Sequence, residues 1–116
     1  MSQDIYQNYL VELKRGTQII VVLSQLFKKE YGYSLLQKLI DRGVSIEAGT
    51  LYPLLRRLEK QGILSSEWDT TMSRPRKYYN LSESGIKLYD YLLEEYRKMV
   101  DEVNSITKGV SYERFN

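Results

Sequence analysis

The sequence predicts a mainly α-helical fold with one small β-hairpin between its third and fourth helices. Apolar residues recur at helical spacing in four segments. Two short runs rich in β-branched and aromatic residues flank a turn at 70–75. The last helical segment keeps a seven-residue apolar repeat. The 116 residues are the size of one domain, so the order helix, helix, helix, strand, strand, long helix accounts for the chain.

The first two helices supply apolar faces for a core. Residues 3–29 are predicted as the first helix, because Ile5, Tyr9 and Leu13 form a stripe that later apolar residues continue. The segment YGYSLLQKLIDR at 31–42 is predicted as the second helix, with its leucines and isoleucine on one side. A glycine follows it at the position where glycine commonly ends a helix.

The third helix is predicted at about 48–61, within GTLYPLLRRLEKQG, with four leucines on one face. Either Ser45 or Glu47 is a candidate cap for its start. Pro53 fits if the helix begins near Gly49, because the first amides of a helix have no acceptor within it. A proline there loses little and has a helical φ already. The sequence therefore predicts a proline in the first turn.

The hairpin is predicted from ILSSEWD at 63–69 and RKYYNL at 76–81, with TTMSRP as the turn between them. Its loop is longer than a two-residue turn. Successive strand residues point to opposite faces, so Tyr78 and Tyr79 point apart. One of them is expected to pack beneath the hairpin with Trp68 as core.

The last helix is predicted to extend to about residue 108, with Ser82 as its N-cap and Gly85 where a reciprocal capping Glu would stand. Its apolar repeat is an a/d seam. The seam packs either against the first helix of the same chain or, as we favour, against that helix and its copy in a second chain. Its members are Ile86, Tyr89, Leu93, Tyr96, Val100 and Val103.

Composition argues against several classes of protein. The chain contains neither His nor Cys, which removes the commonest general base and the commonest metal ligands. We therefore expect no enzyme, no metal and no cofactor. The longest apolar run, IIVVL at 19–23, is far too short to span a membrane. The N-terminus MSQDIYQNYL lacks the features of a signal peptide, so none is expected.

Basic charge is concentrated in the middle of the chain. Residues 47–79 contain six basic and four acidic side chains, whereas 83–102 contain three basic and six acidic ones. On the third helix, polar and cationic residues form two neighbouring rows opposite the leucines. The turn sequence SRPRK adds three cations, and several cations on one face are what phosphate binding needs. The alternatives are a routine solvated helix face and a solubilising turn.

Three helices followed by a hairpin form the winged helix-turn-helix arrangement, in which the third helix enters the major groove and the hairpin, the wing, contacts the backbone. We assign residues 1–81 to a DNA-binding domain, with the recognition helix at 48–61 and the wing at 63–81. Residues 82–108 form a dimerisation helix, and 109–116 a flexible tail. The competing hypothesis is a winged-helix protein-interaction module without specific DNA binding.

The segment GTLYPLLRRLEKQGILSSEWDTTMSRPRKYYNLSESG at 49–85 resembles the signature region of PadR-type transcriptional regulators. The family pattern runs G-T-L-Y-P, R-R-L-E, then glycine with two hydrophobic residues and Ser, E-W, P-R-K-Y-Y, L-T and G. The segment KEYGYSLLQKL at 29–39 is similar to the family's second helix, with Tyr31 where many relatives have His. The resemblance covers about residues 16–86, and the single helix after it resembles the short subfamily.

The resemblance implies a homodimeric winged-helix repressor, usually bacterial and cytoplasmic, that binds double-stranded DNA at an inverted repeat. Several family members respond to phenolic acids or flat hydrophobic drugs near the dimer interface, so a small aromatic effector is implied. Tyr89 and Tyr96 would line its pocket; the alternative is that these rings only pack. The residues expected to bind DNA are Tyr33 before the recognition helix, Thr50, Tyr52, Pro53, Arg56, Arg57 and Lys60 on it, and Arg74, Arg76 and Lys77 in the wing.

Overall fold

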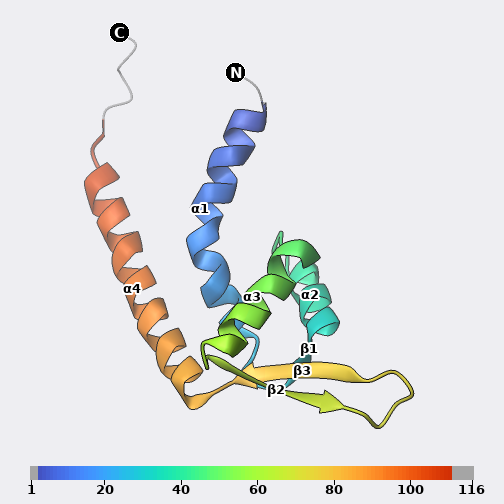
Figure 1. Ribbon diagram of the computed structural model, residues 1–116. Helices are drawn as coiled ribbons and strands as arrows, with labels where there is room; N and C mark the ends of the chain where they lie inside the picture. The colour runs from blue at the N-terminus through green and yellow to red at the C-terminus, as the bar shows by residue number, and fades with distance from the viewer. Residues whose placement is uncertain (1–2, 111–116) are drawn as a thin grey trace.

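The computed structural model describes residues 3–110 and confirms a mainly helical winged-helix fold (Figure 1). It adds one short strand that the sequence did not predict. The elements are α1 (Gln3–Ser24), β1 (Glu30–Tyr31), α2 (Gly32–Asp41), α3 (Ala48–Lys60), β2 (Leu64–Asp69), β3 (Arg76–Leu81) and α4 (Glu83–Thr107).

The predicted extension of the first helix to residue 29 is wrong, because α1 ends at Ser24. The chain turns there, so Leu26 is fully buried and Phe27 is half exposed. The carbonyl of Leu26 accepts a hydrogen bond from the amide of Leu81 at 2.8 Å. A helix through this segment would have left β3 without that donor-acceptor pair. The turn thus joins α1 to the sheet.

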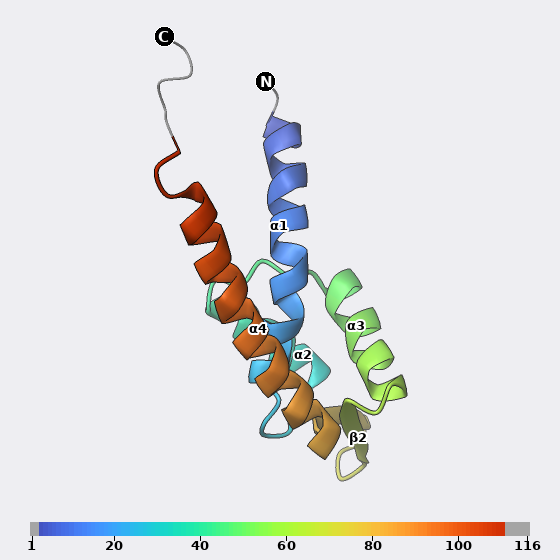
Figure 2. The same ribbon diagram turned by 90° about the vertical axis from the view of Figure 1, so that its left-hand side faces the viewer.

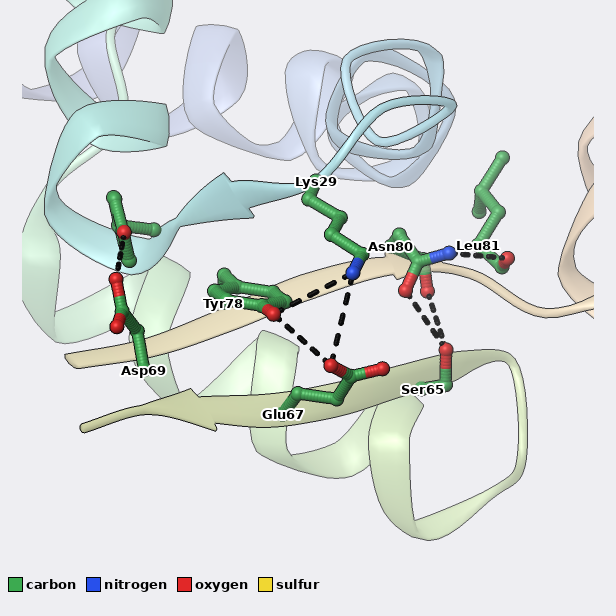
Figure 3. Close-up of polar contacts among 8 residues, drawn as sticks. Lys29, Ser65, Glu67, Asp69, Tyr78, Asn80 and Leu81 are labelled. Atoms are coloured by element: carbon green, nitrogen blue, oxygen red, sulfur yellow. Dashed lines mark hydrogen bonds and ion pairs between the residues drawn. The ribbon is translucent and has the colours of Figure 1, made fainter. Parts of the chain in front are cut away.

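The sheet has three antiparallel strands in the order β1-β3-β2. Its short edge strand β1 pairs Tyr31 with Tyr78, and the wing pairs Asp69 with Arg76 at its outer end. Because side chains alternate along a strand, one face turns toward the helices and the other toward solvent. The solvent-facing side carries polar pairs, including Ser65 with Asn80, whose side chains bond at 2.9 Å (Figure 3).

The core lies where α1, α2 and α3 meet one face of the sheet (Figure 1). The leucines predicted on one side of α3 are all buried there, which confirms that face of the helix. Such burial fixes a helix strongly, since each buried leucine contributes about 1.5–3 kcal/mol relative to exposure. The core comprises Val22, Leu23, Leu26, Leu35, Leu39, Ile46, Leu51, Leu54, Leu55, Leu58, Leu64, Tyr79 and Leu81.

Ser82 caps α4, as predicted, by accepting a hydrogen bond from the amide of Gly85 at 3.0 Å. Its hydroxyl also lies 2.6 Å from the carbonyl of Gly62. Gly85 has a physical reason for lacking a side chain. A Cβ atom there would lie 2.1 Å from the carbonyl oxygen of Ile63, too close for any real contact. The end of α3, the start of the wing and the start of α4 therefore meet at one compact junction.

Beyond this junction α1 and α4 run antiparallel and extend away from the sheet in the same direction (Figures 1 and 2). No helix within residues 3–110 combines the length and apolarity that crossing a membrane requires. Gly109 follows α4 in a left-handed turn, with φ of 78°. The rest of the predicted tail, residues 111–116, lies outside the described residues.

Candidate nucleic-acid interface

The face of α3 opposite its leucines is exposed and cationic. Thr50, Pro53, Arg56, Arg57 and Lys60 all lie on the surface. Among residues 3–110 no carboxylate forms an ion pair with any of the three cations. The buried leucines hold the helix in place, so this charge is presented on a rigid support. Such a face suits binding to an anionic surface.

The predicted place of Pro53 in the first turn is wrong. The helix starts at Ala48, and the amide of Leu51 already donates to the carbonyl of Glu47 at 2.9 Å. Pro53 therefore lies inside the helix, beyond the first turn. Because proline has no amide hydrogen, the Gly49 carbonyl lacks its usual partner four residues on. Glu47 takes the N-cap position but makes no side-chain capping bond.

Tyr52 is half buried rather than openly displayed. Its ring lies against Gly32 at the start of α2, where an added Cβ would be 3.2 Å from the ring. Tyr33 follows one residue later on α2 and is 58% exposed. The two predicted tyrosines thus lie on either side of the α2–α3 contact. Tyr33 is the one whose ring reaches solvent.

A hollow of about 580 Å³ lies between α1 and α3 beside the cationic face. Thr50, Pro53 and Arg57 line one side, and Arg15 and Gln18 of α1 line the other. The sequence did not single out Arg15, because its helix carries no other basic cluster and its neighbourhood depends on tertiary packing. Arg15 brings a second guanidinium group, besides that of Arg57, to this hollow.

The wing cations differ in how they are held. Arg74 is exposed on the turn. Arg76, by contrast, lies over two aromatic rings, with its guanidinium carbon 5.4 Å from the Tyr31 centroid and 5.7 Å from the Tyr33 centroid. It also donates to the Tyr33 hydroxyl at 3.4 Å. A hollow of about 450 Å³ beside these groups joins the start of α2 to the wing turn, residues 70–75.

Lys77 is paired within the chain. Its ammonium lies 2.7 Å from the carboxylate of Glu59 on α3, and Glu59 also accepts a hydrogen bond from Ser66 of β2. The bonded ammonium lowers the pKa of Glu59, and the carboxylate raises the pKa of Lys77. This predicted wing cation therefore links the wing to α3, and only part of its charge faces solvent.

The expectation that Trp68 packs as core is wrong, since it is 62% exposed. It points to the same side of the sheet as Lys77, whose ammonium lies 5.9 Å from the Trp68 ring. Tyr79 is the tyrosine that is buried. Tyr78 lies on the opposite face, where it donates to Glu67 at 2.9 Å beside Lys29 (Figure 3). Most of the Trp68 ring therefore faces solvent.

The predicted seam of α4 divides into two parts. Tyr89 packs on the core and meets the edge of Phe27, with ring centroids 5.2 Å apart. Leu93 is half buried, and the other four predicted residues are exposed: Ile86, Tyr96, Val100 and Val103. The alternative of packing wholly within the chain therefore accounts for only part of the seam.

A hollow of about 380 Å³ separates the outer parts of α1 and α4. Of the two tyrosines predicted to line a ligand pocket, only Tyr96 borders it; Tyr89 lies against Phe27 instead. The lining of the hollow is largely apolar and comprises Leu13, Lys14, Thr17, Tyr96, Met99, Val100, Val103 and Asn104.

Comparison with known proteins now identifies the family. Residues 19–90 match the Transcriptional regulator PadR-like family. The chain belongs to this family. It is similar to a PadR family transcriptional regulator from Eggerthella lenta, with 44% identity, 91% of this chain and 95% of that chain covered, and a TM-score of 0.87. A PadR-like transcription factor from Bacteroides fragilis is 33% identical, with 85% and 98% covered and a TM-score of 0.71.

Among curated proteins, transcriptional regulator Rv3488 of Mycobacterium tuberculosis is 33% identical over 102 residues, covering 87% of this chain and 92% of its own. As a member of the PadR-like family, the chain is a DNA-binding transcriptional regulator and not an enzyme. The exposed cationic face of α3 and the adjacent wing are the surfaces with the shape and charge for that role.

Proposed function

We propose that this PadR-like regulator is a repressor that binds an inverted-repeat promoter site as a homodimer in the cytoplasm. The observation that carries the proposal is the rigid, exposed cationic face of α3, whose cations form no ion pair within residues 3–110, next to a wing that carries more cations. Arginines on such a helix suit both guanine edges and phosphates. A dimer would present two copies of this face, as an inverted repeat requires.

The proposed division of roles follows the geometry. The first half of α3, with Thr50, Tyr52 and Pro53, lies toward the base edges, and Arg56 and Arg57 farther along reach guanine edges as well as phosphates. In the wing, Arg74 of the exposed turn and Arg76 at the start of β3 reach the backbone. The proposed DNA-contacting set is Tyr33, Thr50, Tyr52, Pro53, Arg56, Arg57, Lys60, Arg74, Arg76 and Lys77. Lys77 is included because its side chain, although paired with Glu59, remains partly exposed.

The homodimer is supported by apolar side chains that stay exposed along both long helices. On α1 these are Ile5, Tyr6, Tyr9, Leu10, Val11 and Leu13; on α4 they are Ile86, Tyr91, Tyr96, Met99, Val100, Val103 and Ile106. An exposed apolar surface of this extent is typical of an interface. Sedimentation velocity at micromolar concentration is expected to give a dimer; a monomer would contradict this part of the proposal.

We also propose that a small aromatic effector releases the DNA. The hollow between α1 and α4 is apolar and bordered by Tyr96, which suits a flat ring. Phenolic acids and flat hydrophobic dyes are the probes, followed by tyrosine fluorescence and by release of labelled DNA. If none of them perturbs either signal, and Tyr96→Ala behaves as the wild type, the hollow has only a packing role.

DNA binding itself is tested by selecting duplexes from a random-sequence library with the wild-type protein. Enrichment of an inverted repeat, with binding that weakens steeply as salt rises, is expected. A reporter gene placed behind the selected site is expected to be repressed. If no duplex is retained at low salt, the competing hypothesis of a protein-interaction module replaces the proposed DNA-binding function.

A further inference from the structure

The outer end of the wing is tied to the body of the molecule through Asp69. One carboxylate oxygen accepts from the Tyr31 hydroxyl at 2.6 Å. The other accepts from the hydroxyl of Thr71 at 2.6 Å and from its amide at 3.0 Å, which forms an Asx turn. The Thr71 hydroxyl, and next the Tyr31 hydroxyl, lower the pKa of Asp69 to about 2. Asp69 thus remains ionised at neutral pH, with both oxygens engaged.

Tyr31 also supports a wing cation with its ring. The guanidinium of Arg76 lies 5.4 Å from the Tyr31 centroid. Tyr33 stacks beside Tyr31 with an interplanar angle of 14°, and Arg76 lies near both rings. Arg76 is opposite Asp69 in the β2–β3 register. One half-buried side chain therefore contacts both residues of the last pair before the wing turn.

The end of the wing lies outside the hydrophobic core. The turn residues 70–75 are all exposed, and the nearest buried residue of the hairpin is Tyr79. The Tyr31–Asp69 bond instead joins residues 38 apart in sequence, from the β1–α2 junction to the tip of β2. Figure 3 shows Asp69 at the end of the row of polar contacts, with its dashed bond leading away from the hairpin.

We propose that Tyr31 is a positioning residue for DNA binding: its hydroxyl fixes the wing turn through Asp69, and its ring orients Arg76. It acts through these two residues and does not itself contact DNA. This inference rests on the proposed function, because it assumes that the wing meets the DNA backbone. It adds a residue outside the wing and outside α3 on which the placement of the wing depends.

The test compares Tyr31→Phe with Tyr78→Phe in the full-length protein. The first change removes the hydroxyl from Asp69 and keeps the ring under Arg76. The second is a matched control, because its hydroxyl bonds Glu67 and Lys29 on the same sheet face without reaching the wing turn. Trp68, the single tryptophan, is next to Asp69 and reports on the wing without DNA.

Two readouts are measured for each variant. The first is acrylamide quenching and anisotropy of Trp68 in the free protein. The second is the affinity for a duplex selected by the wild type from a random library, at several salt concentrations. Tyr31→Phe is expected to increase Trp68 mobility and to weaken binding roughly five- to tenfold. The slope of affinity on salt is expected to fall by at most about two, because the hydroxyl is neutral and only the placement of Arg74 and Arg76 against phosphates changes.

The outcomes separate this inference from the proposed function. If the wild type retains no duplex, the proposed function fails, while Trp68 still shows whether Tyr31 holds the wing turn. If DNA is bound but Tyr31→Phe changes neither readout, or matches Tyr78→Phe in both, the inference is overturned. A loss of affinity without any change in Trp68 mobility would also overturn it, since Tyr31 would then act on the DNA otherwise than by holding the wing turn.

Discussion

The cations of α3 and those of the wing lie on neighbouring elements, but different forces hold them in place. The helix is anchored by four leucines that pack into the core, and its arginines make no ion pair within residues 3–110. The wing extends past the core, and its Arg76 and Lys77 are held by tyrosine rings and by Glu59. The α3 surface is therefore held by apolar packing that does not involve its cations, whereas the wing is held by contacts that its cations themselves make.

This difference predicts different sensitivities. Apolar burial depends little on salt or pH, so the position of α3 responds mainly to changes in the core. Polar contacts at the surface are individually weak and are screened by salt. The wing should therefore respond to single hydroxyl or carboxylate changes that leave global stability nearly unchanged.

The largest expected effect is on the anchoring of α3. Leu55 is fully buried, so Leu55→Ala should lower the free energy of unfolding by about 2–5 kcal/mol. Trp68→Ala removes a larger but exposed side chain from the wing and should cost less than about 1 kcal/mol. Chemical denaturation followed by circular dichroism measures both. If both variants lost the same free energy of unfolding, the contrast between a helix held by the core and a wing held by polar contacts would be contradicted.

The next effect separates the two surfaces on DNA. Arg56→Ala with Arg57→Ala should weaken binding to a selected duplex by about tenfold or more, because each good base contact contributes about 1–3 kcal/mol. Binding to a scrambled duplex should change less. Arg74→Ala with Arg76→Ala should weaken both duplexes similarly and lower the salt slope by about two. Anisotropy titrations at several salt concentrations distinguish these patterns, and identical patterns would remove the proposed division of roles.

A smaller effect is expected at the link between the surfaces. Glu59→Gln and Lys77→Met remove the two ends of one ion pair that is about a third exposed. A double-mutant cycle on the free energy of unfolding should give a coupling below about 1 kcal/mol. If Lys77 also binds a phosphate, Lys77→Met alone lowers the salt slope, by about one. An unaltered slope would assign Lys77 to the link only.

The smallest effect is on the titration of Asp69. Its pKa is lowered to about 2, first by the Thr71 hydroxyl and then by the Tyr31 hydroxyl. Its contacts are thus fully stabilising above the unfolded pKa of about 4 and are lost as pH falls toward 2. Carboxyl NMR should show the pKa rising in Thr71→Val and, by less, in Tyr31→Phe. Tyr78→Phe should leave it in place, and a rise there would contradict this account.

The parts of the fold with long periodic patterns were predictable. The leucine face of α3 and the Ser82 cap were read correctly, since each depends on nearby residues. The end of α1 was not, because the apolar spacing continues past Ser24 while the chain turns to bring Leu26 inward. Strand β1 has only two residues, too few to show any alternation.

Within the site, the sequence predicted which side chains are basic but not which are already paired. The contacts of Lys77 with Glu59 and of Tyr31 with Asp69 join residues far apart in sequence. No local spacing predicts such pairs, because they depend on how the wing lies against α2 and α3. The prediction that Trp68 packs as core failed for a related reason. Strand alternation indicates on which face of the sheet Trp68 lies, but not whether a helix covers that position.

The close approach of Gly85 to the Ile63 carbonyl bears on the spacing of the two DNA half-sites in the proposed dimer. It sets the angle at which α4 leaves the domain, and α4 has 25 residues, about 37 Å at 1.5 Å per residue. A tilt of about 10° at its base would move its far end by roughly 6 Å, close to two base-pair steps of about 3.4 Å. In the proposed dimer, the distance between the two half-sites would thus depend on the angle of α4 at Gly85.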